Sequence, residues 1–436
     1  MLSFFSNLGR RVDAVVRPNG KVFYGWYIVA AATGVQWLAA MTWMHSYGAY
    51  TTLLQADFGW SMSVLSWAFA LTRLESGLLG PIQGWLVDRY GPRLILTIGT
   101  IIFAIGFFMF SFVDSIPSFF FAFIMIALGS SLGGWATLMV SIVNWFDRHR
   151  ATAVAWSQMG FSLGGLSVWI IAYGLENLGW QAMAFISGVA ILLIAGPLVQ
   201  VFRHRPEEIG EYPDGIKPEA DEDASSASGV LSFTWQQASR EPSFWLISAG
   251  HGLSLLTVSS LLMHLIPHLI HGLGYELQPA AFIFGMMTAV QLAGLFLGGY
   301  LGDRFNKRLI CVACMVSHFV GLIAIAYADN IFWVILFILA HGLAWGIRGP
   351  LMVALRADYF GPKSFGTIMG ISSLIVMIGM TTGPVFCGWM YDIYGNYERA
   401  FTIMASVSLL GSICFWFATP PKAPPQPPVA AQAEAS

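Results

Sequence analysis

The chain has 436 residues, of which 56% are hydrophobic and 10% are charged, and its formal net charge is −2. Soluble domains carry roughly 25% charged residues, so this composition excludes an ordinary soluble protein and indicates that most of the chain faces lipid. The sequence holds no nucleotide-binding motif, nucleophile elbow or metal-ligand cluster. We therefore expect a membrane protein that is not an enzyme, needs no cofactor or metal and binds no nucleic acid.

Twelve apolar segments are long enough to cross a bilayer core of about 30 Å, which takes roughly 20 residues per helix. Several begin at residues that favour the start of a helix, such as Ser61, Pro117 and Pro242. The first run is too long for a signal peptide and lacks a small-residue cleavage site, so we expect it to be retained. The predicted spans are 24–50, 61–87, 93–113, 117–144, 151–174, 181–202, 243–270, 279–302, 308–327, 331–357, 364–390 and 398–419.

Basic residues predict the orientation of these spans, because Lys and Arg gather on the cytoplasmic side. With the N-terminus inside, 18 of the 21 Lys and Arg residues fall in the tails and inner turns. Arg399 lies in an outer turn, and Arg73 and Arg348 lie within spans. We expect both termini to be cytoplasmic, in a multi-pass protein of the bacterial inner (plasma) membrane that contacts membrane lipids and is a monomer.

Composition divides the chain into four parts. Residues 1–202 and 242–420 hold six predicted spans each, and residues 203–241 form a linker between them. The linker contains PEADEDASSASG, which cannot bury a core and should be mobile. The end of the linker predicts a short interfacial helix with Phe233 and Trp235 toward lipid. The tail, residues 421–436, is rich in Pro and Ala and is expected to be disordered.

A short charged hairpin turn occurs twice. GWLVDRYGPR at 84–93 matches GYLGDRFNKR at 299–308, a separation of 215 positions. Leu138-Met139-Val140 likewise matches Leu351-Met352-Val353, 213 positions later. Two halves of six spans with inner turns in corresponding places predict a parallel repeat, with substrate bound near the midplane between the halves.

The hairpin sequence resembles the loop 2–3 signature of the major facilitator superfamily, and its second copy resembles the loop 8–9 signature. The resemblance implies an all-α membrane protein with 12 transmembrane helices in two pseudo-symmetric six-helix bundles. Tyr24-Gly25-Trp26 is similar to the start of monocarboxylate transporters and oxalate/formate antiporters. The chain departs from that branch, because the eighth span has Gln291 in place of a charge and the eleventh has no Lys or Arg.

The same resemblance implies a gating role for the hairpin. The family's loop acid braces one half against the other, so Asp88 is expected to face the start of the eleventh span near Ser364, where a helix N-terminus favours negative charge. Arg89 and Arg93 would support the turn, at anionic headgroups. The other predicted gating residues are Gly84, Asp303 and Arg304, and the second copy is expected to be the weaker brace.

Ionisable groups at membrane depth are costly and suggest function. Arg348, in the tenth span, shares one helix face with His341 and Trp345. The resemblance implies that spans one, four, seven and ten line the cavity, and under the repeat Arg348 corresponds to Trp135 in the fourth. A cation that faces an aromatic side chain across the cavity predicts a binding site for a small carboxylate with an apolar body. The alternative is an arginine bonded to carbonyls freed around Gly349-Pro350.

Arg73 and Glu75 lie within the second span. Their i, i+2 spacing places them on nearly opposite helix faces, so we expect no pairing between them. Arg73 is a further candidate for binding the substrate. Glu75 is the only acid far from a span end, and burial favours the neutral carboxyl, so it is the predicted proton carrier. The alternative is that each residue pairs with a neighbouring helix and fixes packing.

Histidines and cysteines offer two weaker patterns. His264, His268 and His271 form a stripe in the seventh span that is predicted to line the cavity. The alternative is that these histidines change the charge of the cavity entrance as the pH changes. Cys311 and Cys314 form a C-x-x-C, but no second pair or histidine ligand accompanies it. We interpret these cysteines as buried apolar residues.

These observations predict a secondary active transporter that works by alternating access. Its cargo is predicted to be a small organic anion, most simply a monocarboxylate, moved with a proton or by exchange. One alternative is proton-coupled efflux of an amphipathic drug-like compound, against which the missing Gly-Pro motif of the fifth span counts. A second alternative is a non-transporting sensor on the same scaffold.

Overall fold

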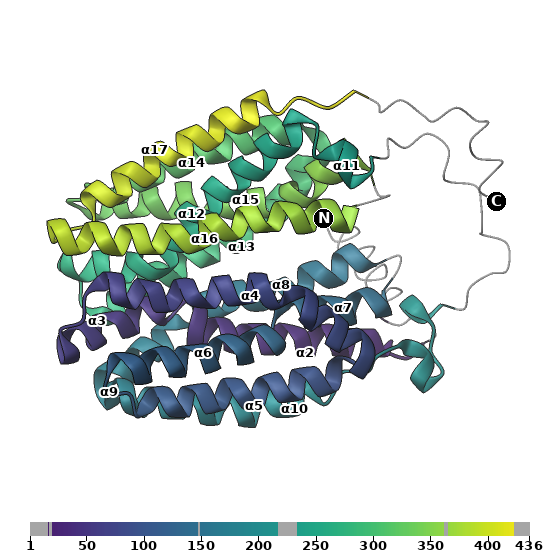
Figure 1. The fold of residues 1–436 in the computed structure, drawn as a ribbon, viewed down its shortest axis with the longest axis horizontal. Coiled ribbons are helices and arrows are strands. Elements are labelled where there is room, and N and C mark those ends of the chain that lie inside the picture. Colours follow the sequence, from purple (N-terminus) through teal and green to yellow (C-terminus); the bar gives the residue numbers. More distant parts are fainter. Residues whose placement is uncertain (1–15, 17–19, 147–148, 217–232, 362–364, 423–436) are drawn as a thin grey trace, which may run out of the picture.

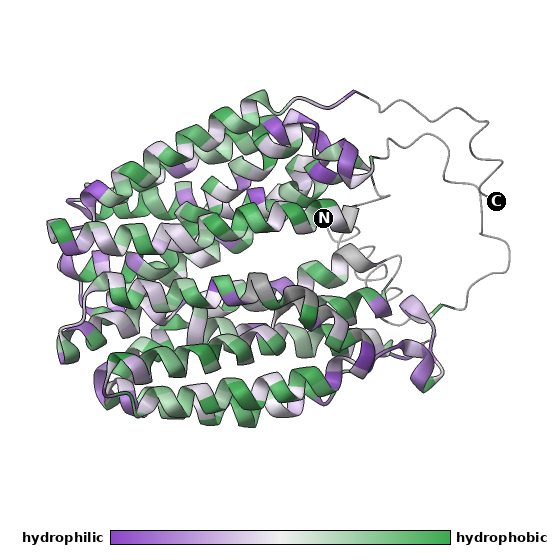
Figure 2. Cartoon of the chain, in the orientation of Figure 1, coloured by the Kyte–Doolittle hydropathy of each residue, from purple (hydrophilic) through white to green (hydrophobic). Residues whose placement is uncertain are grey.

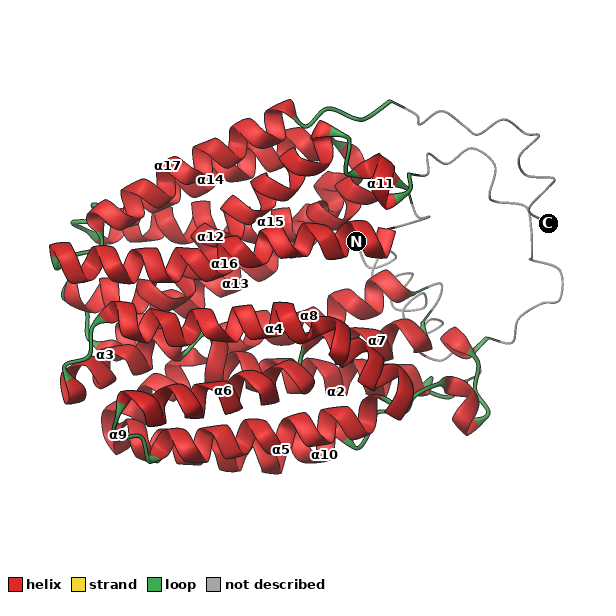
Figure 3. Cartoon of the chain, in the orientation of Figure 1, coloured by secondary structure: helices red, strands yellow, loops and turns green. Residues whose placement is uncertain are grey.

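The computed structural model describes residues 16, 20–146, 149–216, 233–361 and 365–422. Every regular element in these ranges is a helix (Figure 3). For a few positions inside helices only the backbone is described, and these include the predicted site residues Gly84, Asp88 and Trp135. The expectation of an all-α protein is therefore confirmed for the described part of the chain.

The first half of the chain is built from broken and continuous helices. The first span is interrupted by a π-helical turn, η1, and the backbone of α9 leaves the helical region at Gly179, where φ is 80°. The elements are α2 (Tyr24–Ala39), η1 (Ala40–Met44), α3 (Tyr47–Phe58), α4 (Met62–Tyr90), α5 (Pro92–Ser111), α6 (Ile116–Leu132), α7 (Trp135–Trp145), α8 (Arg150–Leu166), α9 (Val168–Ala190), η2 (Ile191–Ala195) and α10 (Gly196–Val199).

The second half consists of longer, mostly unbroken helices. Two short turns, η3 (Pro206–Ile209) and η4 (Pro213–Gly215), and the short helix α11 (Trp235–Ala238) lie between the halves. The long helices are α12 (Pro242–His271), α13 (Leu277–Arg304), α14 (Lys307–Ala326), α15 (Ile331–Phe360), α16 (Phe365–Tyr394) and α17 (Glu398–Phe417).

The predicted helix starts agree with the structure. The Ser61 side chain accepts a hydrogen bond from the backbone N–H of Val64, as an N-cap should, because the first N–H groups of a helix have no partner within it. Pro117 and Pro242 occupy the first turns of α6 and α12, where the missing N–H of proline costs nothing.

Nine helical stretches of the described residues are long and apolar enough to cross a membrane. One of them, Thr152–Val199, runs through the break at Gly179. Hydrophobic residues cover the sides of the helices, and hydrophilic residues gather toward their ends (Figure 2). This distribution fits a multi-pass membrane protein, because side chains in the bilayer core meet no water.

The helices form two groups that follow the order of the chain (Figure 1). Helices α2–α10 lie together on one side, and α12–α17 lie together on the other. We call these the first and second bundles. We call the end of the molecule where α2 begins and α17 ends the tail end, and the opposite end the far end.

The two copies of the charged hairpin make their turns differently. In the first copy, Gly91 adopts φ of 80° and ψ of 155°, a conformation that glycine tolerates, and Pro92 begins α5. In the second, the Asn306 side chain accepts hydrogen bonds from the backbone N–H groups of Arg308 and Leu309 and caps α14. The repeated sequence therefore gives similar helix–turn–helix units with different turn chemistry.

The segment before the second bundle corrects one expectation. Helix α11 forms as predicted, and Trp235 is exposed, but Phe233 is only 1% exposed. The Phe233 ring packs edge-on against Phe360, and its backbone N–H donates to the Phe360 carbonyl. Phe233 therefore fixes the linker to α15, and the prediction that it faces lipid is wrong. The acidic stretch of the linker lies outside the described residues.

Candidate substrate-binding cavity

A cavity of about 810 Å³ lies between the two bundles. It extends from Arg73, near the middle of α4, toward Gln83 and Thr367, which lie closer to the tail end. Its volume is within the usual range for small-molecule sites, roughly 300–1,000 Å³. The described lining residues are Val35, Gln36, Ala39, Ala40, Trp43, Met44, Thr72, Arg73, Gln83, Ser130, Ser131, Gly133, Gly134, Leu138, Phe161, Thr367, Gly370, Ile371, Ser373 and Leu374.

Arg73 is the only charged residue among the described residues that line this cavity. Its guanidinium lies 5.1 Å from the centre of the Phe69 ring and donates from Nη2 toward the sulfur of Met44. Its Nε has no hydrogen-bond partner among the described residues. A thioether and an aromatic face are weak partners for a cation, so Arg73 keeps the capacity to bind an anion in the cavity.

Neutral polar groups supply the rest of the cavity's hydrogen-bonding surface. Two of them are anchored across the first bundle: Gln36 donates to the carbonyl of Ser157, and Gln83 donates to the carbonyl of Ser131 and the hydroxyl of Thr137. Trp43 and Phe161 add aromatic surface. One cation, fixed amides and aromatic walls suit a small molecule with a charged end and an apolar body.

Irregular backbone brings some of these groups to the cavity. The π-helix η1 carries Met44, and π-helical turns are frequent at functional sites. The break between α6 and α7 falls at Gly133 and Gly134, which both line the cavity. A Cβ on Gly134 would lie 2.1 Å from the carbonyl oxygen of Ser130, so the break requires glycine there.

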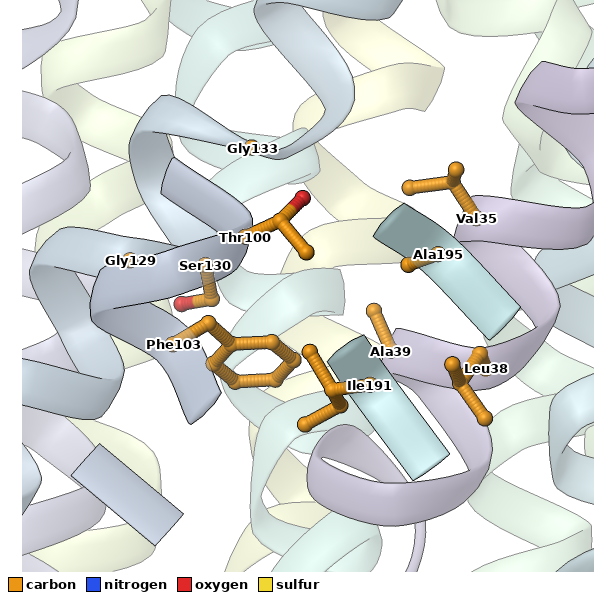
Figure 4. A pocket seen from close by; sticks show the side chains of 10 residues that line it. All are labelled: Val35, Leu38, Ala39, Thr100, Phe103, Gly129, Ser130, Gly133, Ile191 and Ala195. Atoms are coloured by element: carbon orange, nitrogen blue, oxygen red, sulfur yellow. The ribbon is translucent and has the colours of Figure 1, made fainter. Parts of the chain in front are cut away.

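A second, much smaller cavity of about 20 Å³ lies within the first bundle. Figure 4 shows that the hydroxyls of Thr100 and Ser130 are the polar side-chain groups around it, among apolar residues such as Phe103 and Ile191. Such a volume holds about one water molecule. It is too small for an organic substrate, so we assign it no binding role.

The structure places Arg348 away from the described lining of the large cavity. The side chain is 1% exposed, within the second bundle, and Nε and Nη1 have no hydrogen-bond partner among the described residues. The alternative of bonds to carbonyls around Gly349-Pro350 is therefore not seen for these two atoms. Arg356, two turns later, does find partners: it donates to the carbonyl of Met352 and the hydroxyl of Ser372.

The other residues predicted on the Arg348 face are also buried. Nδ1 of His341 lies 3.0 Å from Nδ1 of His318, so a single proton shared between these two atoms joins α14 to α15. The Trp345 ring packs edge-on against Phe161, with ring centres 6.3 Å apart. Phe161 lines the large cavity, so Trp345 contacts a lining residue without being among the lining residues itself. The side chain of Trp135 lies outside the described residues.

Glu75 lies two residues after Arg73 on α4, within range of its charge. The charge of Glu75 acts on the Arg73 guanidinium, and this effect needs no direct pairing of the two side chains. The carboxylate is half-buried near the middle of the helix. A proton bound to Glu75 would therefore change the field at the one described cation of the cavity.

The predicted gating residues that are described lie on the surface at the tail end. Arg89 packs over the rings of Trp85 and Tyr90, and Arg304 lies 3.7 Å from the ring centre of Tyr300. Nε of Arg93 donates to Gln200 within the first bundle. Asp303 is exposed. The side chains of Gly84 and Asp88, and the residue Ser364, lie outside the described residues.

The histidine stripe of α12 does not line the described cavity. His264 lies within hydrogen-bond distance of the Tyr397 hydroxyl and the Pro384 carbonyl, and Nε2 of His268 lies 2.8 Å from the Ile325 carbonyl. These partners belong to the second bundle. His264 and His268 therefore join helices near the far end, and the prediction that these two line the cavity is wrong, while His271 is exposed at the end of α12.

Sequence reasoning missed most of the neutral lining residues, including Gln36, Thr72, Gln83 and Ser373. An uncharged polar residue in an apolar span is common, so it gives no signal by itself. The π-helix and the Gly133-Gly134 break gave no distinct signal either, because they arise from tertiary packing.

The sequence model of the Major Facilitator Superfamily matches residues 32–328 and 252–436 of the chain. The chain belongs to this superfamily. Among curated relatives, Monocarboxylate transporter 13 of Bos taurus is 24% identical over 411 residues, covering 91% of this chain and 89% of the relative. The Agnestins efflux protein AgnL12 of Paecilomyces divaricatus is 26% identical, covering 85% of this chain and 81% of the relative.

Solved structures of the superfamily share the fold of this chain. A bacterial homologue of the human lysosomal transporter Spinster, described as inward-facing and occupied, superposes with a TM-score of 0.70 at 16% identity. The match covers 92% of this chain and 97% of that structure. The superfamily member described here is thus a monocarboxylate-transporter-like membrane transport protein, and the prediction that it is not an enzyme is confirmed by its family.

Proposed function

We propose that this transporter moves a small organic anion, most simply a monocarboxylate, by alternating access. The observation that carries the proposal is that Arg73 is the one charged residue among the described residues lining the central cavity. A cation attracts an anion more strongly in a protein cavity than in bulk water, because the effective dielectric constant there is lower. The forked guanidinium also matches the two oxygens of a carboxylate.

The remaining lining supports an anion with an apolar body. Trp43 and Phe161 offer aromatic surface, and Gln36 and Gln83 offer fixed amides. Monocarboxylate transporters among the relatives point to the same class of substrate. Dicarboxylates fit the proposal less well, because a second charge would find no second cation on the described lining.

We assign the coupling proton to Glu75. The charges of Glu75 and Arg73 interact, so protonation of Glu75 would leave the full field of Arg73 for the substrate carboxylate. Anion and proton would then cross together with no net charge. Anion exchange is the alternative mode, and it requires no change at Glu75.

Arg348, Trp345, His341 and Trp135 remain proposed substrate contacts from the two facing helices. Trp345 lies directly behind Phe161 of the cavity wall. The unpartnered atoms of Arg348 give it free donors within the second bundle. We propose that these residues reach the substrate when the bundles change their relative orientation during transport.

The proposed topology has twelve spans, both termini in the cytoplasm and a monomeric protein in the plasma membrane of a bacterial cell. The tail end, toward which the cavity extends, would then face the cytoplasm. The hairpin residues Gly84, Asp88, Arg89 and Arg93 would close this end in the opposite state, with Asp303 and Arg304 as the second brace.

Efflux of a larger amphipathic compound is the second candidate. The cavity, at about 810 Å³, has room for more than a short carboxylate, and one relative is named an efflux protein. The two functions differ in the size and charge of the ligand. An amphipathic acid would still use Arg73, whereas an amphipathic cation would be repelled by it.

The test is a ligand panel on the purified protein. Monocarboxylates, dicarboxylates, amphipathic acids and organic cations are compared by the shift in thermal unfolding, and compounds that bind are then tested for uptake into proteoliposomes with and without a pH gradient. Stabilisation and uptake of monocarboxylates support the proposal. Stabilisation by large organic cations alone would contradict it.

A further inference from the structure

Two carboxylates at the far end of the molecule bind the starts of helices in the opposite bundle. Asp392, near the end of α16, accepts hydrogen bonds from the backbone N–H groups of Met62 at 2.8 Å and Ser63 at 2.9 Å. Glu176, in α9, accepts a hydrogen bond from the backbone N–H of Gln278 at 3.0 Å. Each bond therefore crosses from one bundle to the other.

The two contacts are related by the internal repeat. Gln278 lies 216 positions after Met62, and Asp392 lies 216 positions after Glu176. Met62 is the first residue of α4 and Gln278 the second residue of α13. Each bundle thus offers one carboxylate and receives one, and the arrangement is reciprocal.

The chemistry of the contact favours a charged acceptor. The first N–H groups of a helix have no partner within it, and the helix dipole places partial positive charge there. Helices α4 and α13 are 29 and 28 residues long. A carboxylate at such a helix start gains both hydrogen bonds and charge attraction, whereas a neutral amide gains less.

The bundles are tightly packed beside these contacts. A Cβ on Gly388 of α16 would lie 2.8 Å from the carbonyl oxygen of Met62, and a Cβ on Gly285 of α13 would lie 3.2 Å from that of Leu166. His264 of α12 lies 3.3 Å from the hydroxyl of Ser66 of α4, and both side chains are fully buried. The far end is therefore closed, while the cavity extends toward the tail end.

We propose that Asp392 and Glu176 form a two-point latch that holds the far end closed and must release both helix starts before the far end opens. The latch is a property of the conformational cycle and does not depend on which substrate is carried. It differs from the predicted hairpin brace, which acts at the tail end. Its loss favours the far-end-open state in the absence of any substrate.

The test is a distance measurement between spin labels on the full-length protein in lipid nanodiscs without substrate. Labels are placed at Ile116→Cys and Ile331→Cys, exposed positions at the far end of the two bundles, with the partly exposed Cys414 changed to Ala. Asp392→Asn and Glu176→Gln are each expected to raise the ratio of open to closed far end by about two- to five-fold, and the double variant by about the product. Glu398→Gln removes an exposed carboxylate from the first turn of α17 and should change nothing.

Ionic strength gives a second measurement that needs no change to the latch. Raising salt from about 0.1 to 1 M screens exposed charges, so the unmodified latch should open more at high salt while the double variant responds less. The proposal would be overturned if the unmodified protein, the two single variants and the double variant gave the same distance distributions. It would also be overturned if Glu398→Gln shifted the distribution as much as the latch variants do. Since the salt response is read on the unmodified latch, a variant that fails to fold does not remove the test.

Discussion

The hydroxyl of Ser162 in α8 donates a hydrogen bond of 2.6 Å to Oε1 of Gln291 in α13, and both side chains are buried. The bond joins the two bundles near mid-height, close to the Phe161 wall of the cavity. Any motion that separates α8 from α13 must break it. Gln291 is the polar side chain through which α13 is joined to α8 in the first bundle.

A double-mutant cycle tests this tie. Ser162→Ala and Gln291→Ala each remove one partner of a buried neutral hydrogen bond, so we expect a coupling free energy of unfolding of about 0.5–1.5 kcal/mol. Denaturant unfolding of the detergent-solubilised single and double variants measures it. Purely additive effects would mean that the two groups do not act on each other in solution.

Replacing Arg348 should separate stability from transport. Arg348→Met removes a buried charge with two unpartnered donors, so the thermal midpoint should rise, by about 1 °C for each kcal/mol gained in a chain of this length. Anion uptake should fall at least ~10-fold if the guanidinium meets the substrate. Arg356→Met is the control, because Arg356 has hydrogen-bond partners and its loss should destabilise the fold. Normal uptake by Arg348→Met would remove Arg348 from the binding site.

Neutralising Glu75 should uncouple transport from the proton. Glu75→Gln keeps the size of the side chain but cannot gain or lose a proton, so substrate counterflow should continue while accumulation driven by a pH gradient disappears. Both are measured on the same proteoliposomes. Accumulation that matches that of the unmodified protein would assign the proton to another group.

The two hairpin copies should contribute unequally to gating. Asp88→Asn is expected to slow transport more than Asp303→Asn, because the first copy carries the Gly91-Pro92 turn and the second replaces it with Asn306-Lys307. Initial uptake rates at equal protein density give the comparison. Equal losses in the two variants would indicate that both hairpins brace the bundles to the same extent.

Much of the fold could be predicted because long apolar runs in a membrane have few alternatives to the helix. Ser61, Pro117 and Pro242 mark helix starts by local chemistry alone, and all three agree with the structure. The η1 turn and the break at Gly133-Gly134 could not be predicted in the same way. They depend on how neighbouring helices pack, which local sequence does not record.

The site was predicted in part. Arg73 was recognised because a charge inside a span is rare, and it lines the cavity. His264 and His268 were predicted to line the cavity from their spacing, but helix spacing alone does not say whether a face meets the cavity or another helix. Asp392 and Glu176 lie at span ends, where acids usually face solvent, so only their shared offset of 216 could have paired them with Met62 and Gln278.

Substrate counterflow in proteoliposomes tests most directly whether Arg73 holds the substrate anion. Arg73→Ala, Arg73→Lys and the control Arg399→Ala, which removes an exposed arginine outside the cavity, are compared with the unmodified protein. We predict that Arg73→Ala loses about 10- to 100-fold in monocarboxylate counterflow, that Arg73→Lys retains part of it, and that Arg399→Ala retains all of it. Full counterflow by a folded Arg73→Ala variant would show that Arg73 does not hold the substrate anion.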